Sequence, residues 1–225
     1  MYSLVAQLTD TFRQHANPSK AAEMERYMKN LFPFFGIQAP TRRAIHKAWL
    51  KEATAQTHTS DQRWELVHTL WIQEEREFQH TCIDWIQTWK KQEWNQEDGT
   101  QLTWILTNKS WWDSVDTIAT HFVGNYCKCF PNEGAQLIQY YRTSSNIWLN
   151  RTAILFQLKY KKETDLDLLE EICAQFEPNK EFFIQKAIGW SLREAGKTFP
   201  TEVKAMVERL KLSGLARREA LRRMG

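Results

Sequence analysis

The segment KSWWDSVD, residues 109–116, carries side chains that could act on a positively charged group. Trp112 and Asp116 are four residues apart, so on a helix they lie on the same side, one turn from each other. An aromatic face and a carboxylate both stabilise positive charge. The alternative is that Trp112 packs beneath a loop and that Asp116 is merely solvated.

The neighbouring tryptophan, Trp111, belongs to a different side of the same helix. It begins an apolar stripe at the i+4, i+7 and i+11 spacing, which continues with Val115, Ile118 and Phe122. Such a stripe predicts a face that packs into the core. We therefore expect Trp111 to be buried and Trp112 to be exposed.

A second polar candidate, Arg151, lies within the segment NIWLNRTAILFQLKY. It falls in the middle of a side formed by apolar residues, among them Trp148, Ile154 and Leu158. A guanidinium in that position is costly unless a carboxylate or a phosphate pairs with it. Two interpretations are open: an ion pair with Asp116, one repeat earlier, or a contact with a phosphate or substrate.

A third group of candidates lies in the segment EFFIQKAIGWSLREAGK. One side of this helix is apolar, and the opposite side carries Lys186, Gly189, Trp190 and Arg193. Cations suit phosphates, aromatic faces suit bases or sugars, and glycine lets another backbone come close. A merely solvated face rarely combines tryptophan with glycine, so this pattern favours a functional surface.

The elements that must position these residues are helices throughout. Asn17 and Pro18 predict a helix start, with Asn17 as the N-cap, and the helix should run to about Asn30. Another begins at Pro40, and further helices are predicted at about 61–72, 74–91, 98–107, 110–124, 134–142, 146–161, 165–176, 180–195, 201–211 and 213–223. No segment indicates a strand.

An internal repeat relates the middle helices. Phe78, Asp113, Trp148 and Phe183 are each 35 residues apart, and Asp116, Arg151 and Lys186 share that register. A fixed period of this kind predicts an all-α fold, an α-solenoid of paired helices. The period lies between those of tetratricopeptide and HEAT repeats. Such arrays are curved, and their concave face usually binds something extended.

Composition limits the classes of function. The 225 residues suit one domain or a compact repeat array, here 1–225, and the net charge of +3 does not by itself indicate nucleic acid. The four cysteines lack the spacing of a zinc site, which favours reduced thiols in a cytoplasmic protein. The first residues do not resemble a signal peptide, and no apolar run is long enough for a membrane span.

Several segments together resemble the AlkD-type alkylpurine DNA glycosylases, which are HEAT-like-repeat DNA alkylation repair proteins. The resemblance runs from the first helix to about residue 200 and is weaker in SGLARREALRRMG. The segments that carry it are YMKN (27–30), GIQ (36–38), KSWWDSVD (109–116), NIWLNRTAILFQLKYK (146–161) and EFFIQKAIGW (181–190).

The resemblance implies roles for individual residues. The catalytic aspartate of the family corresponds to Asp116, its two active-site tryptophans to Trp112 and Trp190, and its active-site arginine to Arg151. Lys159 and Arg193 are similar to residues that contact the DNA backbone, and Lys186 lies on the same face. Arg43 is a further candidate for a contact with the DNA backbone, and Tyr27 and Gln38 match residues near the DNA groove in the first repeat.

The activity that the resemblance implies is hydrolysis of the N-glycosidic bond of cationic alkylated purines, N7-alkylguanine and N3-alkyladenine, in duplex DNA without base flipping. The expected partner is double-stranded DNA containing such lesions. No metal or organic cofactor and no membrane partner is implied, and a monomer associated with DNA in the cytoplasm, at the nucleoid, is expected.

Two alternatives remain open. The first is a non-catalytic solenoid that recognises damaged or branched DNA, which would have no use for the anion of Asp116. The second is a protein-interaction scaffold, which would place apolar residues rather than arginine and lysine on its inner face.

Overall fold

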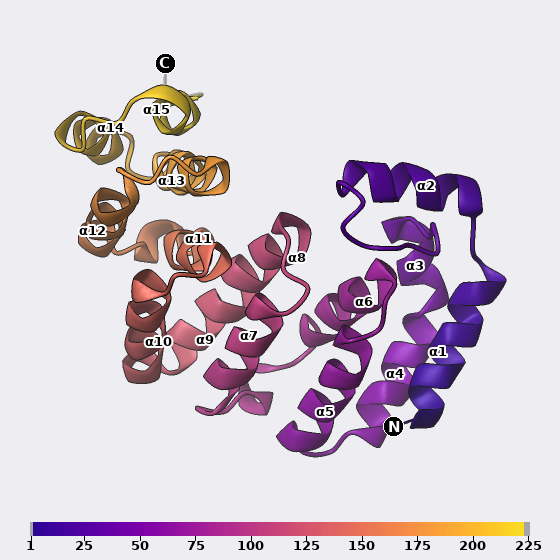
Figure 1. Cartoon of the computed structure of the whole chain (residues 1–225). Coiled ribbons are helices and arrows are strands. Elements are labelled where there is room, and N and C mark those ends of the chain that lie inside the picture. The colour runs from indigo at the N-terminus through magenta and orange to yellow at the C-terminus, as the bar shows by residue number, and fades with distance from the viewer. Residues whose placement is uncertain (1, 223–225) are drawn as a thin grey trace. The chain divides into compact units, whose positions relative to one another are not determined.

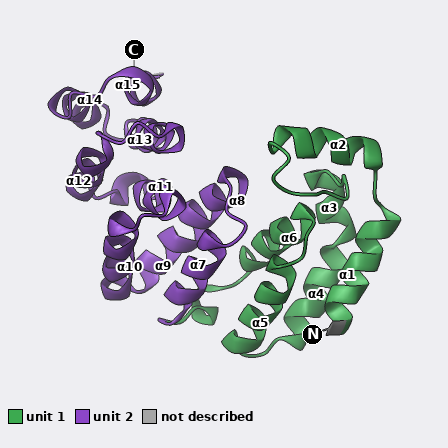
Figure 2. Ribbon diagram, viewed as in Figure 1, with its two compact units in different colours: residues 1–95 green, residues 96–225 purple. Residues whose placement is uncertain are grey.

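The computed structural model describes residues 2–222, and within that range every regular element is helical (Figure 1). The all-α solenoid predicted from the sequence is confirmed. The chain divides into two compact units, residues 1–95 and residues 96–225 (Figure 2). Each unit has its own packing, described separately below, and the assignment of residues 1–225 to one functional domain stays a prediction.

The first unit consists of short helices. They are α1 (Tyr2–Gln14), α2 (Pro18–Tyr27), α3 (Ala39–Ile45), α4 (Lys47–Gln56), α5 (Ser60–Trp71), α6 (Arg76–Ile86) and the 3₁₀ turn η1 (Lys91–Glu93). The N-cap predicted at Asn17 is present, because its side chain accepts a hydrogen bond from the backbone N–H of Lys20. Helix α1 was not anticipated by the sequence analysis.

A buried carboxylate, Glu77, organises the core of the first unit. It accepts hydrogen bonds from the backbone N–H groups of Phe35, Gly36 and Ile37 in the connector between α2 and α3. The ring of Phe35 contacts Phe78, the residue after Glu77. The loop backbone therefore finds its partners on α6, as buried polar groups require.

The second unit contains the candidate site. Its elements are α7 (Asp98–Thr107), α8 (Trp112–Thr117), η2 (Ile118–Val123), α9 (Gly124–Cys129), α10 (Pro131–Thr143), α11 (Ile147–Leu155), η3 (Lys161–Glu163), α12 (Leu166–Phe176), α13 (Phe182–Ala195), α14 (Pro200–Arg209) and α15 (Gly214–Leu221). The segment η2 is a π-helix, so α8, η2 and α9 form one helical run with a wider turn in its middle.

The repeat read from the sequence is present in the helix starts. Helices α6, α8, α11 and α13 begin at Arg76, Trp112, Ile147 and Phe182, which are 35 or 36 residues apart. Each of these helices therefore holds the same place in successive helical pairs. Within the second unit, this periodicity brings residues of α8, α11 and α13 face to face.

Some expected boundaries were wrong. The helix expected to start at Ser110 begins at Trp112 and runs to Cys129, beyond the expected end at residue 124. The helix expected over 146–161 ends at Leu155, where turns begin. The last helix ends at Leu221, and residue 223 of the expected range lies outside the described residues. Within residues 2–222, no helix combines the length and apolar character that crossing a membrane requires.

Candidate functional site

The centre of the candidate site is an ion pair between Asp116 of α8 and Arg151 of α11. Arg151 Nε donates to one carboxylate oxygen (2.8 Å) and Nη2 donates to the other (2.9 Å). This is the bidentate geometry in which an arginine fixes the plane of a carboxylate. Of the two interpretations that the sequence left open for Arg151, the ion pair is therefore present.

A third bond attaches the guanidinium to the next repeat. Arg151 Nη1 donates to the backbone carbonyl of Phe183 at the start of α13, and the guanidinium carbon lies 5.8 Å from the centre of the Phe183 ring. Taken as a whole residue, Arg151 is only 4% exposed. With Nε and both Nη groups engaged inside the protein, Arg151 holds three consecutive repeats together through one buried side chain.

Asp116 keeps an open edge. Its side chain is 19% exposed, whereas that of Arg151 is 5% exposed. Burial raises the pKa of Asp116, while the hydrogen bonds and charge of Arg151 act in the opposite direction. Each carboxylate oxygen has a further lone pair beyond the one that Arg151 occupies. The aspartate is thus oriented from behind and can still accept a hydrogen bond or face a cation.

The two adjacent tryptophans differ from their predicted placement. Trp111 was expected to be buried as part of the helix, but both Trp111 and Trp112 are half-buried. The reason is that Trp111 precedes the helix in an extended conformation (φ −157°, ψ 162°), so helical spacing does not govern its direction. The remaining members of the stripe, Val115, Ile118 and Phe122, are buried as expected.

Trp111 instead joins an aromatic cluster beside the ion pair. Its ring centre lies 5.4 Å from that of Trp148 and 5.2 Å from that of Phe183, both at steep angles. Trp148 and Phe183 are themselves 5.0 Å apart. Since the cluster includes the residue whose carbonyl binds Arg151, it helps to fix the guanidinium. Sequence reasoning treated Phe183 only as a repeat marker.

The predicted cationic face of α13 is present but is not free. Lys186 Nζ lies 2.9 Å from one carboxylate oxygen of Glu219, and Arg193 Nη1 bonds the other oxygen. These bonds lower the pKa of Glu219. Glu219 lies in the weakest part of the family resemblance, which is why the sequence analysis overlooked it. Its only signal was its position on a helix expected near the end of the chain.

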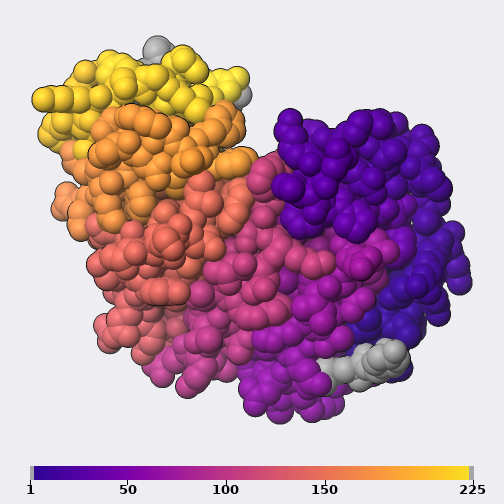
Figure 3. Space-filling view, viewed as in Figure 1, coloured from indigo at the N-terminus to yellow at the C-terminus, as the bar shows by residue number. Residues whose placement is uncertain are grey.

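Gly189 explains how α15 reaches α13. A Cβ atom on Gly189 would stand 2.4 Å from Cβ of Glu219 and 2.8 Å from the backbone oxygen of Ala216. The space-filling view shows the yellow surface of α15 directly against the orange surface of α13 (Figure 3). The backbone that comes close to this glycine is therefore the protein's own last helix, with Ala216 and Ala220 buried in the contact.

The remaining candidates of the second unit lie nearer the surface. Trp190 of α13 is half-buried, and Lys159 is exposed in the turns after α11. Burial lowers the pKa of His121, and the positive charge of Lys159 lowers it further. An exposed cation beside a neutral imidazole is suited to contact an anion.

The candidates of the first unit are exposed at the end of α2 and on α3. Tyr27 ends α2 and is 69% exposed, Gln38 directly precedes α3, and Arg43 lies on α3. Arg43 Nε donates to Asp84 (3.2 Å), yet the side chain of Arg43 stays 63% exposed. These three positions have the accessibility that a contact with a large ligand requires.

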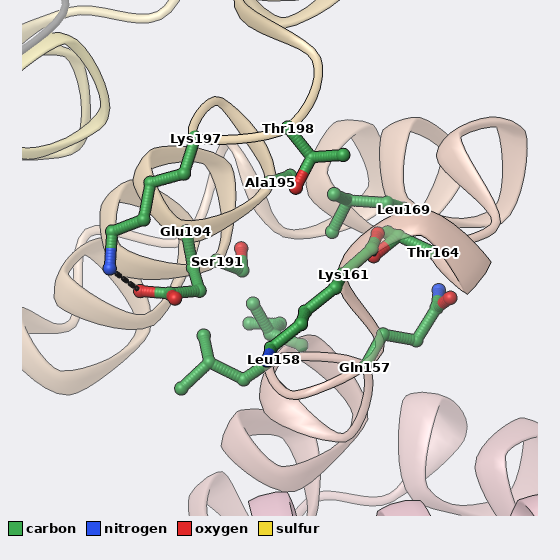
Figure 4. Close-up of a pocket in the computed structure, with 11 residues that line it drawn as sticks. Gln157, Leu158, Lys161, Thr164, Leu169, Ser191, Glu194, Ala195, Lys197 and Thr198 are labelled. Atoms are coloured by element: carbon green, nitrogen blue, oxygen red, sulfur yellow. Dashed lines mark hydrogen bonds and ion pairs between the residues drawn. The ribbon is translucent and has the colours of Figure 1, made fainter.

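A pocket of the second unit lies away from these residues. It has a volume of about 170 Å³ and is lined by α11, α12 and α13 with the turns that follow α11 and α13; Leu158, Leu169 and the Glu194–Lys197 ion pair form parts of its wall (Figure 4). None of the candidate site residues lines it, and it is smaller than the roughly 300 Å³ typical of small-ligand sites. Among residues 2–222, no cluster of side chains has the composition of a metal site.

Comparisons with known proteins agree with this architecture. A family model described as "DNA alkylation repair enzyme" matches residues 8–224. The chain is also similar to the solved structure of a predicted DNA alkylation repair enzyme from Enterococcus faecalis. The two are 35% identical, with a TM-score of 0.84, over 92% of this chain and 96% of that chain. No curated protein matches the sequence.

Proposed function

Because the chain belongs to the DNA alkylation repair enzyme family, we propose that it is a monofunctional DNA glycosylase acting on cationic alkylated purines in duplex DNA. The observation that carries this proposal is the Asp116 carboxylate, which Arg151 holds by two hydrogen bonds while one edge stays open. A protein that only bound phosphates would gain nothing from an oriented anion near its ligand.

The proposed reaction breaks the bond between C1′ of the deoxyribose and the purine nitrogen. Alkylation at N7 of guanine or N3 of adenine leaves the purine cationic, so it departs as a neutral base with the electron pair of the broken bond. The sugar passes through an oxocarbenium-like state, as in glycoside hydrolysis. Water adds at C1′ and releases its proton, which yields an abasic site and free base.

Asp116 stabilises the positive charge that develops on the sugar and orients the attacking water. Such electrostatic stabilisation is worth about 3 kcal/mol, by analogy with one oxyanion-hole donor. Burial raises the pKa of Asp116 while Arg151 opposes that rise, so Arg151 helps to keep the carboxylate ionised in a partly dry site. Arg151 is then a positioning residue, in line with the ion pair that was one of the two interpretations open from the sequence.

Trp112 of α8 and Trp190 of α13 would hold the sugar and favour its cationic state through their π-faces. Lys159 and Arg193 would contact phosphates of the backbone. Excision without base flipping needs no deep pocket for the base, and none of the candidate residues lines the pocket formed by α11, α12 and α13. Bulky cationic adducts would also be tolerated there.

The test is release of free base from a duplex that carries one N7-methylguanine. Wild-type protein should release the base and leave an abasic site, and Asp116→Asn should not. If wild-type protein binds the duplex but releases no base above the spontaneous rate, the chain is better described as a non-catalytic DNA-binding solenoid.

A further inference from the structure

Helices α3 and α4 present an exposed face of unusual composition. The residues exposed between Thr41 and Gln56 are Thr41, Arg43, Ala44, Lys47, Ala48, Lys51, Thr54, Ala55 and Gln56. This face contains three cations, and its other members are alanine, threonine or glutamine. No carboxylate and no bulky apolar side chain is fully exposed on it. A solvated helix face usually mixes both signs of charge.

The two lysines of this face are unpaired within residues 2–222. Neither Lys47 nor Lys51 makes an ion pair or a side-chain hydrogen bond there, whereas Lys128, Lys186 and Lys197 each reach a carboxylate. Lys47 and Lys51 are four residues apart, so they stand one turn, or about 6 Å, from each other along α4. They form a short row of free positive charge.

One carboxylate of α4, Glu52, is half-buried, and its two oxygens accept hydrogen bonds from the side chains of Gln7 and Gln56. A second carboxylate beside this face, Asp84, is already neutralised. One oxygen accepts from Arg42 Nη2 (2.9 Å) and the other from Arg43 Nε (3.2 Å). Its side chain is only 9% exposed. Two guanidinium groups share one carboxylate, so this cluster keeps a net positive charge. Arg43, bound through Nε alone, directs the rest of its guanidinium outward.

The positive charge continues beyond Lys51 into a surface hollow of about 500 Å³. Lys51, Arg63 and Lys90 contribute three cations to its walls, and Glu93 contributes one carboxylate. That carboxylate accepts a hydrogen bond from the backbone N–H of Lys90 (2.6 Å) and lies 3.9 Å from Arg63 Nη1. Glu93 therefore has its partners within the protein, whereas the side chains of Lys51 and Lys90 are exposed.

We propose that Arg43, Lys47, Lys51 and Lys90, here called the α4 basic face, bind the phosphate backbone of duplex DNA that flanks the lesion. The inference rests on the proposed function for the identity of the ligand. Charge complementarity carries it: a row of unpaired cations separated by small side chains lets a polyanion approach closely. The alanine and threonine side chains between the cations are short, which favours contacts with the backbone phosphates over contacts with the base edges, so binding should depend little on sequence.

The experiment measures the binding of an undamaged duplex at several salt concentrations, by fluorescence anisotropy, for wild-type protein and the double variant Lys47→Gln/Lys51→Gln. Because each lost phosphate contact removes about 0.9 from the slope of log K against log salt, the slope should become shallower by about two. The affinity of the double variant for DNA at low salt should also fall, because two attractive contacts with phosphates are lost. Both side chains are exposed, so the thermal midpoint should not change.

The matched control is Lys204→Gln, which removes an exposed helical lysine that has Glu208 one turn away on α14. It should leave the slope near the wild-type value. If the double variant binds DNA with the affinity and salt slope of wild type, the inference is overturned. If, in a second assay, wild type binds anionic phospholipid vesicles and the double variant loses only that binding, the ligand of this face is a membrane rather than DNA.

The same variants separate this inference from the proposed function. Single-turnover excision by the double variant should need a higher protein concentration to reach its maximum rate than excision by wild type, because the α4 basic face contributes to binding of the substrate duplex. If wild-type protein releases no base, the proposed function fails, and the salt slope still reports on the α4 basic face. If excision occurs but the double variant binds as wild type, only the inference fails.

Discussion

Asp116 and Arg151 are joined by two parallel hydrogen bonds, of 2.8 and 2.9 Å, across the boundary between consecutive repeats. A bidentate pair of this kind removes the rotational freedom of the carboxylate. The open edge of Asp116 is therefore presented in one direction, before any ligand arrives. Preorganisation of this sort is what allows a charged group to stabilise a transition state without first reorganising.

The first prediction concerns the charge of Asp116. Asp116→Asn should lower single-turnover excision of N7-methylguanine by roughly two orders of magnitude or more, the effect of losing about 3 kcal/mol of transition-state stabilisation. DNA affinity should be kept or slightly increased, since an anion near phosphates is lost. Asp113→Asn is the matched control and should stay near wild type. If Asp113→Asn were inactive and Asp116→Asn active, the catalytic aspartate would be Asp113, and the assignment to Asp116 would be wrong.

The second prediction concerns the buried guanidinium. Arg151→Ala leaves Asp116 without its partner and the carbonyl of Phe183 without its donor, so it should reduce the free energy of unfolding by roughly 3–5 kcal/mol. Introduced into the Asp116→Asn variant, Arg151→Ala should reduce the free energy of unfolding by less, because the carboxylate that would be left unpaired is already absent. Urea unfolding of the four proteins gives a coupling energy, expected to be about 1–3 kcal/mol. Strictly additive losses would mean that the ion pair is energetically unimportant.

The third prediction concerns Glu219, which neutralises two cations of α13. Glu219→Gln should free Lys186 and Arg193 for phosphates, so DNA binding at low salt should strengthen and its salt slope should steepen by up to about one. Stability should change little, because both cations are partly exposed.

Glu208→Gln serves as the control for Glu219→Gln. It removes the same charge from an ion pair with Arg217 that lies in solvent. Equal effects of the two variants would show that only net charge matters, and weaker binding by Glu219→Gln would show that the carboxylate instead orders the cations for DNA.

The fourth prediction concerns the stability of the first unit at mildly acidic pH. Burial lowers the pKa of His46 to about 4, Asp84 acts in the opposite direction, and Arg42 and Arg43 add to the lowering. An unfolded histidine titrates near 6.5. Between these values the unfolded chain binds a proton that the folded chain does not, so stability present above pH 6.5 is lost as the pH falls toward 4.

The loss attributable to His46 should be roughly 2 kcal/mol by pH 5 and should approach roughly 3 kcal/mol near pH 4. It is measured by urea unfolding at about pH 7.5 and about pH 5. His46→Gln, which keeps a polar partner for Thr81 (3.1 Å from Nδ1 in the wild type), should show a smaller difference between the two pH values. An equal difference in both proteins would mean that other groups cause the acid sensitivity.

The sequence was sufficient for features that depend on periodicity. Helix positions followed from apolar spacing, and the 35-residue register placed Asp116 opposite Arg151. Features that depend on local irregularity were not predictable. Trp111 left the predicted stripe because the helix starts at Trp112, two residues later than expected, and no helical pattern could reveal that. Glu219 was missed because its partners are 33 and 26 residues away, outside the register of the repeat.

The π-helical turn at Ile118–Val123 follows directly after Asp116. Such turns are α-helices that have gained one residue. Deleting one residue within this turn would restore the ordinary pitch and leave α9 facing the same way relative to α8, because a π-turn uses one residue more than an α-turn for the same rotation. Tyr126 would keep its hydrogen bond to the carbonyl of Gln96, and Gly124 would keep its place beside Phe156. Among relatives, a one-residue alignment gap in this turn should therefore leave Tyr126 and Gly124 unchanged.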